Sequence, residues 1–558
     1  MMHKAFSFSC IILIVVSFSC LAQTNPGKVA AVKASTSKTN KAVVDNHPKL
    51  IVGLVIDQMR WDFLYRYKSR YSTNGFNRLL AQGYSCENTM IPYMPTYTAP
   101  GHACIYTGSV PAINGIIGNN WYNRKTNSSV YCTQDDSVKT VGSSSNLGKM
   151  SPKNLWATTI TDELRLSTNF TSKVIGIALK DRGAILPAGH SANAAYWYDD
   201  IAGSFITSTH YMDELPAWVL AFNKQQLPAT YMQQDWNTLL PIATYIQSTA
   251  DDKTYEATIA GESKPVFPHR LSAITTAKNA AFKTTPFANS YSFDFAKAAI
   301  KNESLGNNTV PDFLTLSISS TDYIGHTFGP NSIEIEDTYL RLDKDIADFL
   351  TYLDKTVGKG NYLFFLSADH GVAHVPAFTK EHKIPGGSVS DEALAKKLNT
   401  LIAEKFGIQK AIITVMNYQV YLSDSTVSQK ESIGELIITE LKKEDFIADA
   451  IVLNNVANAA VPAPQKERMI NGFSPGRSGD IQFIFKPGYF DGGTKGTTHG
   501  LWNPYDAHIP LLFFGWNIKP GKTCRETYMT DIAATIAALL HIQMPNGSVG
   551  KVITEVIK

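Results

Sequence analysis

Several features of other protein classes are missing from this 558-residue sequence, and each absence argues against one kind of site, membrane span or partner. The six cysteines form no Cys-x₂-Cys pair of the kind that holds a structural zinc ion. Beyond the N-terminus there is no run of about 20 apolar residues that could cross a bilayer. A formal net charge of only +3 indicates no polyanionic partner such as a nucleic acid. With 44% hydrophobic and 18% charged residues, the composition is that of a globular protein.

The first 22 residues are typical of a secretory signal peptide. A basic residue precedes an apolar stretch at 10–18, and we expect cleavage after Ala22. A lipoprotein signal centred on Cys20 is the weaker alternative, because the three residues before it are not the small aliphatic ones usual at such sites. Residues 23–48 are polar, lack a hydrophobic period and predict a flexible leader. The sequence therefore predicts a periplasmic or secreted protein.

Removal of this signal would leave four cysteines. An even number in an exported protein permits two disulfides in three pairings, and the spacing selects none of them. Reduced core cysteines are an equal alternative for the first two. The four are Cys86, Cys104, Cys132 and Cys524.

Strand-like apolar runs alternate with long segments that contain helical patterns. The runs lie at 50–56, 174–179, 313–318, 362–367 and 509–514, and the clearest helical patterns at Ile333–Leu353 and Asp531–Leu540. This alternation predicts an α/β fold with a mainly parallel central sheet and helices on both faces. We expect one catalytic domain over residues 49–558.

Two long segments interrupt the alternation and carry none of the clustered acidic and histidine residues. The first, at about 187–300, is rich in Tyr, Trp, Pro and Asn. The second, at about 380–480, contains plausible helices at Asp391–Phe406 and Ser428–Lys443. Since α/β enzymes place substrate-selecting material in loops beyond the strand ends, we interpret both as insertions that cap or frame a site.

Acidic and histidine residues follow the apolar runs closely. Because strand C-termini converge on one edge of an open α/β sheet, these residues can meet there although they are far apart in sequence. Carboxylates and imidazoles together suit Zn²⁺ and similar ions, and a pair of such ions about 4 Å apart is a clamp for displacement at phosphorus. The six candidate ligands are Asp57, Asp322, His326, Asp369, His370 and His499.

A candidate nucleophile lies between the first and second of these clusters. In Thr98-Ala-Pro100-Gly, the proline is typical of the first turn of a helix. A threonine at that position meets free backbone N–H groups that favour a phosphate. A hydroxyl is a poor nucleophile, so Thr98 would need a base or a metal beside it.

Together these residues resemble the alkaline phosphatase superfamily, and within it the branch of PafA-type phosphate-irrepressible alkaline phosphatases and nucleotide pyrophosphatase/phosphodiesterases. The match extends from about Leu50 to Gly500. The resemblance implies two zinc ions per chain. It assigns one to Asp322, His326 and His499, and the other to Asp57, Asp369 and His370 with the nucleophile Thr98 bridging to it.

The same resemblance implies three groups that bind the phosphoryl oxygens. Asn119 matches a Gly-Ile-Ile-x-Asn motif, and Lys180 with Arg182 matches the Lys-x-Arg pair of the monoesterases. Extra cations favour a monoester, because it carries nearly two negative charges and a diester only one. The Cys-x-Pro-x-Arg pattern of sulfatases is missing, since the corresponding residues are Thr98-Ala-Pro-Gly.

These observations predict an alkaline phosphatase that hydrolyses small-molecule phosphate monoesters through a covalent phosphothreonine. They predict no nucleic-acid partner and no membrane span, and they are compatible with a monomer. The alternative on the same scaffold is a phosphodiesterase or nucleotide pyrophosphatase, for which the aromatic segment near 187–235 could hold the second ester group. A non-enzymatic protein with a degenerate site is disfavoured because no ligand position is substituted. His102 and His374 we interpret as packing or supporting hydrogen-bond residues.

Overall fold

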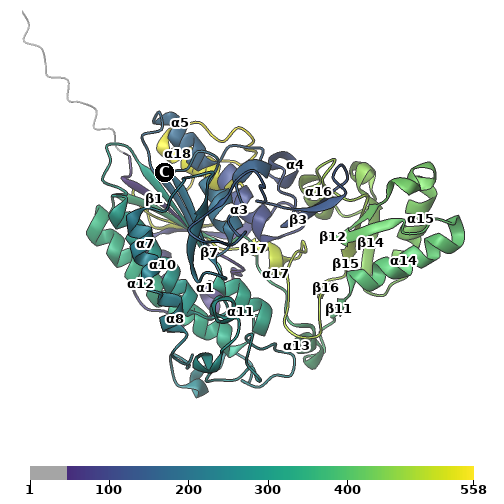
Figure 1. The fold of residues 1–558 in the computed structure, drawn as a ribbon, viewed down its shortest axis with the longest axis horizontal. Coiled ribbons are helices and arrows are strands. Elements are labelled where there is room, and N and C mark those ends of the chain that lie inside the picture. The colour runs from purple at the N-terminus through teal and green to yellow at the C-terminus, as the bar shows by residue number, and fades with distance from the viewer. Residues whose placement is uncertain (1–46, 558) are drawn as a thin grey trace, which may run out of the picture. The chain divides into compact units, whose positions relative to one another are not determined.

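The computed structural model describes residues 47–557, so the predicted signal peptide and nearly all of the leader lie outside the described residues. Within this range one central sheet has eleven strands (Figure 1). In order across the sheet they are β17 (His508–Ile509), β2 (Tyr84–Met90), β18 (Leu511–Gly515), β10 (Tyr362–Ser367), β1 (Leu50–Ile56), β9 (Asp312–Ile318), β6 (Val174–Ala178), β7 (Ala194–Asp199), β8 (Ser204–Ser208) and β5 (Thr140–Val141), with β19 (Gly521–Tyr528) beside β2.

The centre of the sheet is parallel. Strand β1 pairs in parallel with β10 on one side and β9 on the other, and β6 continues from β9 in the same direction. Every residue of these four strands is buried, as expected for a parallel sheet covered on both faces. The predicted α/β fold with its mainly parallel core is confirmed, although β18 runs antiparallel to both β10 and β2, and β8 runs antiparallel to β7.

Helices cover both faces of the sheet (Figure 1). On one face lie α10 (Phe287–Asn302) and α12 (Ile333–Leu353), and on the other α3 (Thr98–Thr107), α5 (Ile160–Ser167), α6 (Asp181–Ala188) and α18 (Asp531–Leu540). Two of them, α12 and α18, span the predicted residues. Helix α12 begins at Ser332, whose side chain accepts a hydrogen bond from the N–H of Ile335 and so caps the helix.

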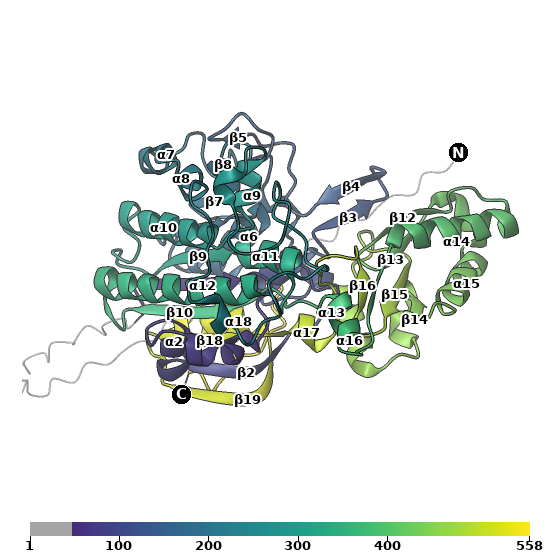
Figure 2. The ribbon, with the colours of Figure 1, turned by 90° about the horizontal axis from the view of Figure 1, so that it is seen from below.

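The two segments interpreted as insertions differ in structure. The segment at about 187–300 contributes β7 and β8 to the central sheet. The segment at about 380–480 provides β12 (Ile412–Met416), β13 (Gln419–Leu422) and β14 (Ile447–Val452), which with β15 (Ile481–Phe485) form a separate four-stranded sheet. Helices α14 (Asp391–Phe406) and α15 (Lys430–Leu441) pack on this sheet around a hydrophobic core of their own (Figure 2).

The cysteines outside the predicted signal form no disulfide in the structure. Cys86, Cys104 and Cys132 are buried, and Cys524 is exposed. Burial raises the pKa of the Cys86 and Cys132 thiols to about 12, which keeps both of them protonated at neutral pH. No helix within residues 47–557 combines the length and hydrophobicity that a membrane crossing requires.

Candidate functional site

The six candidate ligands form two groups beyond the C-terminal ends of the parallel strands. Asp57 follows β1, Asp369 and His370 follow β10, and α11 (Ser320–Phe328) follows β9 and carries Asp322 and His326. His499 lies in the loop between β16 (Tyr489–Asp491) and α17 (Pro504–Ala507). In each group one ligand atom per residue lies within 4.8 Å of the other two; the groups are Asp322, His326 and His499, and Asp57, Asp369 and His370.

The separations between these ligand atoms suit a tetrahedral ion. Ligands bound at 2.0–2.1 Å in a tetrahedron lie about 3.3–3.4 Å apart. In the first group, Oδ1 of Asp322 is 3.1 Å from Nε2 of His326 and 3.7 Å from Nε2 of His499. In the second group, Nε2 of His370 is 3.5 Å from Oδ1 of Asp57 and 3.5 Å from Oδ2 of Asp369. Both groups therefore have the dimensions of a zinc site.

Backbone carbonyls orient all three histidines. Nδ1 of His326 lies 2.8 Å from the carbonyl oxygen of Thr497, and Nδ1 of His370 lies 2.9 Å from that of Gly371. Nδ1 of His499 lies 2.7 Å from that of Thr96. A carbonyl can only accept, so Nδ1 carries the proton and Nε2 presents its lone pair to the group. Burial lowers the pKa of His370, and burial beside two other imidazoles holds the pKa of His499 well below its usual range. Both rings are neutral at pH 7, as metal ligation requires.

The carboxylates of the site are buried, and two of their oxygens accept no hydrogen bond from the described residues. Asp57 and Asp369 are fully buried; Oδ1 of Asp57 and Oδ2 of Asp369 lie 3.3–3.5 Å from histidine nitrogens. A buried carboxylate oxygen without a partner is costly unless a cation satisfies it. Lys180 supplies one positive charge for three carboxylates, Asp57, Asp322 and Asp369. Burial and the neighbouring Asp322 and Asp369 raise the pKa of Asp57 well above its usual range, so this carboxyl lacks a sufficient positive charge beside it and the donor set fits bound zinc.

Thr98 begins α3 beside the second group. Its Oγ1 lies 3.4 Å from Nε2 of His370, the same separation as between the ligands themselves. The start of α3 comes this close because Gly101 has no side chain: a Cβ there would lie 2.4 Å from the carbonyl oxygen of Asp369. Asn119 accepts a hydrogen bond from the N–H of Ala99 at 2.9 Å through Oδ1, which leaves its amide NH₂ as a donor next to Thr98.

Lys180 and Arg182 lie at the start of α6 in different surroundings. The Lys180 ammonium donates to Asp57 at 2.7 Å and to Asp322 at 2.5 Å, so it joins the two ligand groups. Although burial disfavours its charge, Asp322 and Asp57 outweigh burial and raise the pKa of Lys180. The Arg182 guanidinium donates to the Tyr131 hydroxyl at 2.9 Å, while its Nε is buried and pairs with no described residue. The pair's contact with phosphate stays a prediction.

Gln58 was missed by the sequence analysis, although it follows Asp57 directly. Its N–H donates to Oδ1 of Asp369 at 3.1 Å and its side-chain amide to Oδ1 of Asp322 at 2.7 Å, so it links the two ligand groups. Its φ of +65° is rare for a residue other than glycine. Gly325 provides the room, because a Cβ there would lie 1.8 Å from Oε1 of Gln58. Only its position after a strand-end ligand could have drawn attention to it.

Replacing Gln58 by glycine is expected to weaken zinc binding about 10-fold to 100-fold, because Asp322 keeps the Lys180 contact at Oδ2 but loses the donor that orients Oδ1. Glycine keeps the N–H bond to Asp369 and accepts the positive φ, so the free energy of unfolding should change little. Zinc affinity would be measured by competition with a chelating dye, with chemical denaturation as the control. Unchanged zinc affinity would mean that the contact with Asp322 positions nothing.

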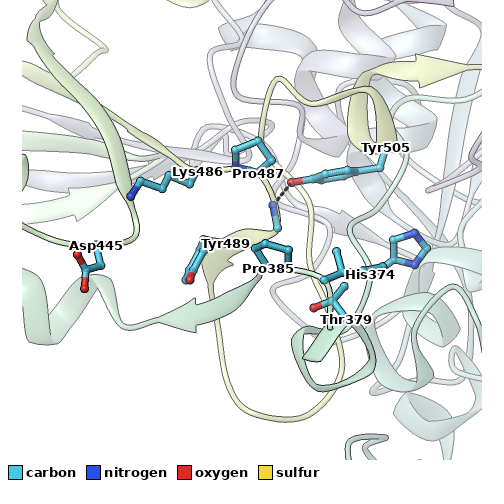
Figure 3. A pocket seen from close by; sticks show the side chains of 10 residues that line it. His374, Thr379, Pro385, Asp445, Lys486, Pro487, Tyr489 and Tyr505 are labelled. Carbon is cyan, nitrogen blue, oxygen red and sulfur yellow. Dashed lines mark hydrogen bonds between the residues drawn. The ribbon is translucent and has the colours of Figure 1, made fainter. Parts of the chain in front are cut away.

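His102 and His374 lie close to the motifs in sequence but are not among the six candidate ligands. Nδ1 of His102 contacts the carbonyl of Thr98 at 2.9 Å and Oδ2 of Asp369 at 3.3 Å, so it packs behind the candidate nucleophile. His374 lines a cavity of about 650 Å³ that contains none of the candidate ligands (Figure 3). Tyr505 forms part of the wall, and its hydroxyl accepts a hydrogen bond from the N–H of Gly488 at 3.0 Å.

A family model for type I phosphodiesterase / nucleotide pyrophosphatase matches residues 51–506, which include all the candidate site residues. The chain belongs to this family. The predicted resemblance to the alkaline phosphatase superfamily is thereby confirmed, and the chain is an enzyme of that superfamily.

Individual members of the type I phosphodiesterase / nucleotide pyrophosphatase family are similar over most of the chain. Alkaline phosphatase PhoV of Synechococcus elongatus is 55% identical, over 92% of this chain and 93% of the relative. A Myroides odoratus protein named calcium-transporting ATPase is 56% identical, over 92% of this chain and 95% of the relative. The crystal structure of wild-type alkaline phosphatase PafA matches with a TM-score of 0.90 and 51% identity, over 92% of this chain and 99% of that one.

Proposed function

We propose that this protein is a two-zinc phosphomonoesterase in which Thr98 forms a covalent phosphothreonine. The observation that carries the proposal is the placement of the Thr98 hydroxyl 3.4 Å from Nε2 of His370, at the edge of one of the two three-residue ligand groups. Similarity to PhoV and PafA, both named alkaline phosphatases, supports hydrolysis of phosphate monoesters.

The residues divide the reaction between them. Thr98 Oγ1 attacks phosphorus in line, the bond to the leaving oxygen breaks as the bond to Oγ1 forms, and water later hydrolyses the phosphothreonine to phosphate. The NH₂ of Asn119, whose Oδ1 is held by Ala99, is free to donate to a phosphoryl oxygen. Lys180 and Arg182 would add positive charge where negative charge redistributes in the transition state.

Zinc would be held by Asp322, His326 and His499 in one group, and by Asp57, Asp369 and His370 in the other. When bound, the ions supply positive charge that favours ionised oxygen on the threonine and on the departing alcohol. The chain's own part is to hold neutral Nε2 atoms and ionised carboxylates at the spacing the ions require.

Metal removal tests the proposal. We expect the purified enzyme to contain about two zinc ions per chain and to release phosphate from an aryl phosphate. Prolonged chelation should lower this activity at least 10³-fold, and added zinc should restore it, because both the nucleophile and the leaving oxygen depend on the ions. Full activity in a chelated sample whose elemental analysis shows no metal would contradict the proposal. The name of the Myroides relative adds ATP to the phosphate compounds that should be assayed.

The four-stranded sheet supports the proposed framing role of the segment at about 380–480. Asn417, at the turn between β12 and β13, donates to the carbonyl of Asn120 at 2.8 Å, next to Asn119. The Tyr418 hydroxyl donates to the carbonyl of His499 at 3.2 Å. Both contacts connect this sheet to candidate site residues, and the exact boundaries of the segment stay a proposal, as do the signal peptide and export.

A further inference from the structure

A second group of buried acidic residues lies between α12 and the long loop before α10. Glu334, in the first turn of α12, and Glu256, in the loop, are each 1% exposed. His269 is fully buried beside them, with Nε2 3.3 Å from Oε1 of Glu334 and Nδ1 2.9 Å from Oε2 of Glu262. None of these residues belongs to the candidate catalytic site.

Carboxylate oxygens of this group are buried without hydrogen bonds. Within the described part of the chain, both side-chain oxygens of Glu334 and Oε2 of Glu256 lack a hydrogen-bond partner. Glu334 meets only the ion-pair contact with His269, and that imidazole is shared with Glu262. Buried carboxylates are normally hydrogen-bonded or paired with a cation, so these oxygens indicate a position that a positive charge would occupy.

The charges of the group point the same way. His269 contacts two glutamates, Glu262 and Glu334, and its single positive charge can balance only one of them. Burial, reinforced by the neighbouring Glu334, raises the pKa of Glu256 to about 9. Burial opposes a charge on His269, but Glu262 and Glu334 outweigh it and raise its pKa to about 9. Ionisation of all three glutamates would leave two negative charges in excess even with His269 protonated, so Glu256 keeps a proton at neutral pH unless a cation takes its place.

We propose that Glu256 and Glu334 bind a hard divalent cation of the calcium class at this position. Carboxylate oxygens are the ligands that Ca²⁺ prefers, and its flexible coordination by six to eight oxygens allows backbone carbonyls or water to complete the shell. A charge of +2 balances the two excess negative charges. The group has no sulfur and only one imidazole, already held by two carboxylates, so zinc is the poorer match.

The loop that would be fixed by this cation supports the candidate catalytic site from behind. The N–H of Ala257, next to Glu256, donates to the carbonyl of Thr327 at 2.9 Å, next to the candidate ligand His326. The carbonyl of Tyr255 accepts from the N–H of Gly496 at 2.9 Å, in the loop that leads to His499. The cation would therefore brace the segments that carry two candidate zinc ligands.

Calcium binding to the full chain tests the proposal. Equilibrium dialysis with radioactive Ca²⁺, at a fixed low concentration of free zinc, should show about one bound Ca²⁺ per wild-type chain. Millimolar Ca²⁺ should raise the midpoint of thermal unfolding by at least about 2 °C, since a ligand that binds only the folded state stabilises it. The double variant Glu256→Gln/Glu334→Gln should lose both the bound Ca²⁺ and the shift.

Glu381→Gln is the matched control. Glu381 is an exposed carboxylate that pairs with Lys253 of the same loop at 2.7 Å, so its loss should leave Ca²⁺ binding and the shift intact. Absence of Ca²⁺ binding by the wild type would overturn the proposal. In that case protons would hold the group. The unfolding midpoint would then fall as pH rises from about 4.5 to about 9, because the folded state keeps a proton on Glu256 that the unfolded state releases. Zinc content, measured in the same samples, tests the catalytic site separately.

Discussion

Replacement of Thr98 by alanine is expected to lower kcat/KM for an aryl phosphate roughly 10⁴-fold or more, with both zinc ions retained. Alanine removes the hydroxyl together with the γ-methyl group, and the hydroxyl oxygen lies 3.4 Å from Nε2 of His370 without being one of the six candidate ligands. Steady-state kinetics with elemental analysis of the same sample would measure both quantities. Because serine keeps the hydroxyl, Thr98→Ser should retain much more activity than Thr98→Ala.

The Thr98 account also specifies where phosphate is found during turnover. Acid quenching of the wild type with substrate, followed by mass spectrometry of peptides, should find phosphate on Thr98. A Thr98→Ala enzyme that loses zinc would mean that the residue is mainly a ligand. Phosphate trapped on another residue would identify a different nucleophile.

Removal of Lys180 and Arg182 together is expected to lower kcat/KM for a monoester about 10²-fold to 10⁴-fold and to change diester hydrolysis much less. A dianionic phosphoryl group gains more from two nearby cations than a monoanionic one. The measurement compares an aryl phosphate with its methyl diester in the Lys180→Ala/Arg182→Ala variant. Zinc content must be measured in parallel, because Lys180 also pairs with Asp57 and Asp322.

Lys283 offers a control close to Lys180. The two ammonium groups lie 5.2 and 5.1 Å from the centroid of the same ring, that of Tyr323, but Lys283 pairs with Asp200 and contacts no candidate ligand. Lys283→Ala should leave the preference for monoesters unchanged. An equal loss of monoester and diester hydrolysis in the double variant would instead assign Lys180 to the metal site alone.

Sequence patterns predicted the elements whose burial is either uniform or periodic. Strand β1 and helix α12 have the predicted bounds, because a run of apolar residues or a 3.6-residue period reports directly on burial. The six candidate ligands could be grouped because strand ends converge and because their spacing resembles a known family. The sequence places β7 and β8 in an insertion, since membership of the central sheet depends on the pairing of β7 with β6 and of β8 with β7 rather than on local pattern.

Other features depend on conformations that a sequence does not display. Gln58 adopts a positive φ that local preference disfavours, and only tertiary contacts with Asp322 and Asp369 make the reason visible. The contacts of the Lys180 ammonium with Asp57 and Asp322 likewise become visible only in the structure, and its contact with phosphate stays a prediction. The buried pair Glu256 and Glu334 carries no motif, because its members come from a loop and a helix 78 positions apart.

The most direct test of the central claim is the ratio of kcat/KM for an aryl phosphate monoester to kcat/KM for the matching methyl diester, measured with zinc-replete wild-type enzyme. A phosphomonoesterase with Lys180 and Arg182 at its phosphate site should prefer the monoester by at least about 10²-fold. A preference for the diester would contradict the account and identify the protein as a phosphodiesterase on the same scaffold.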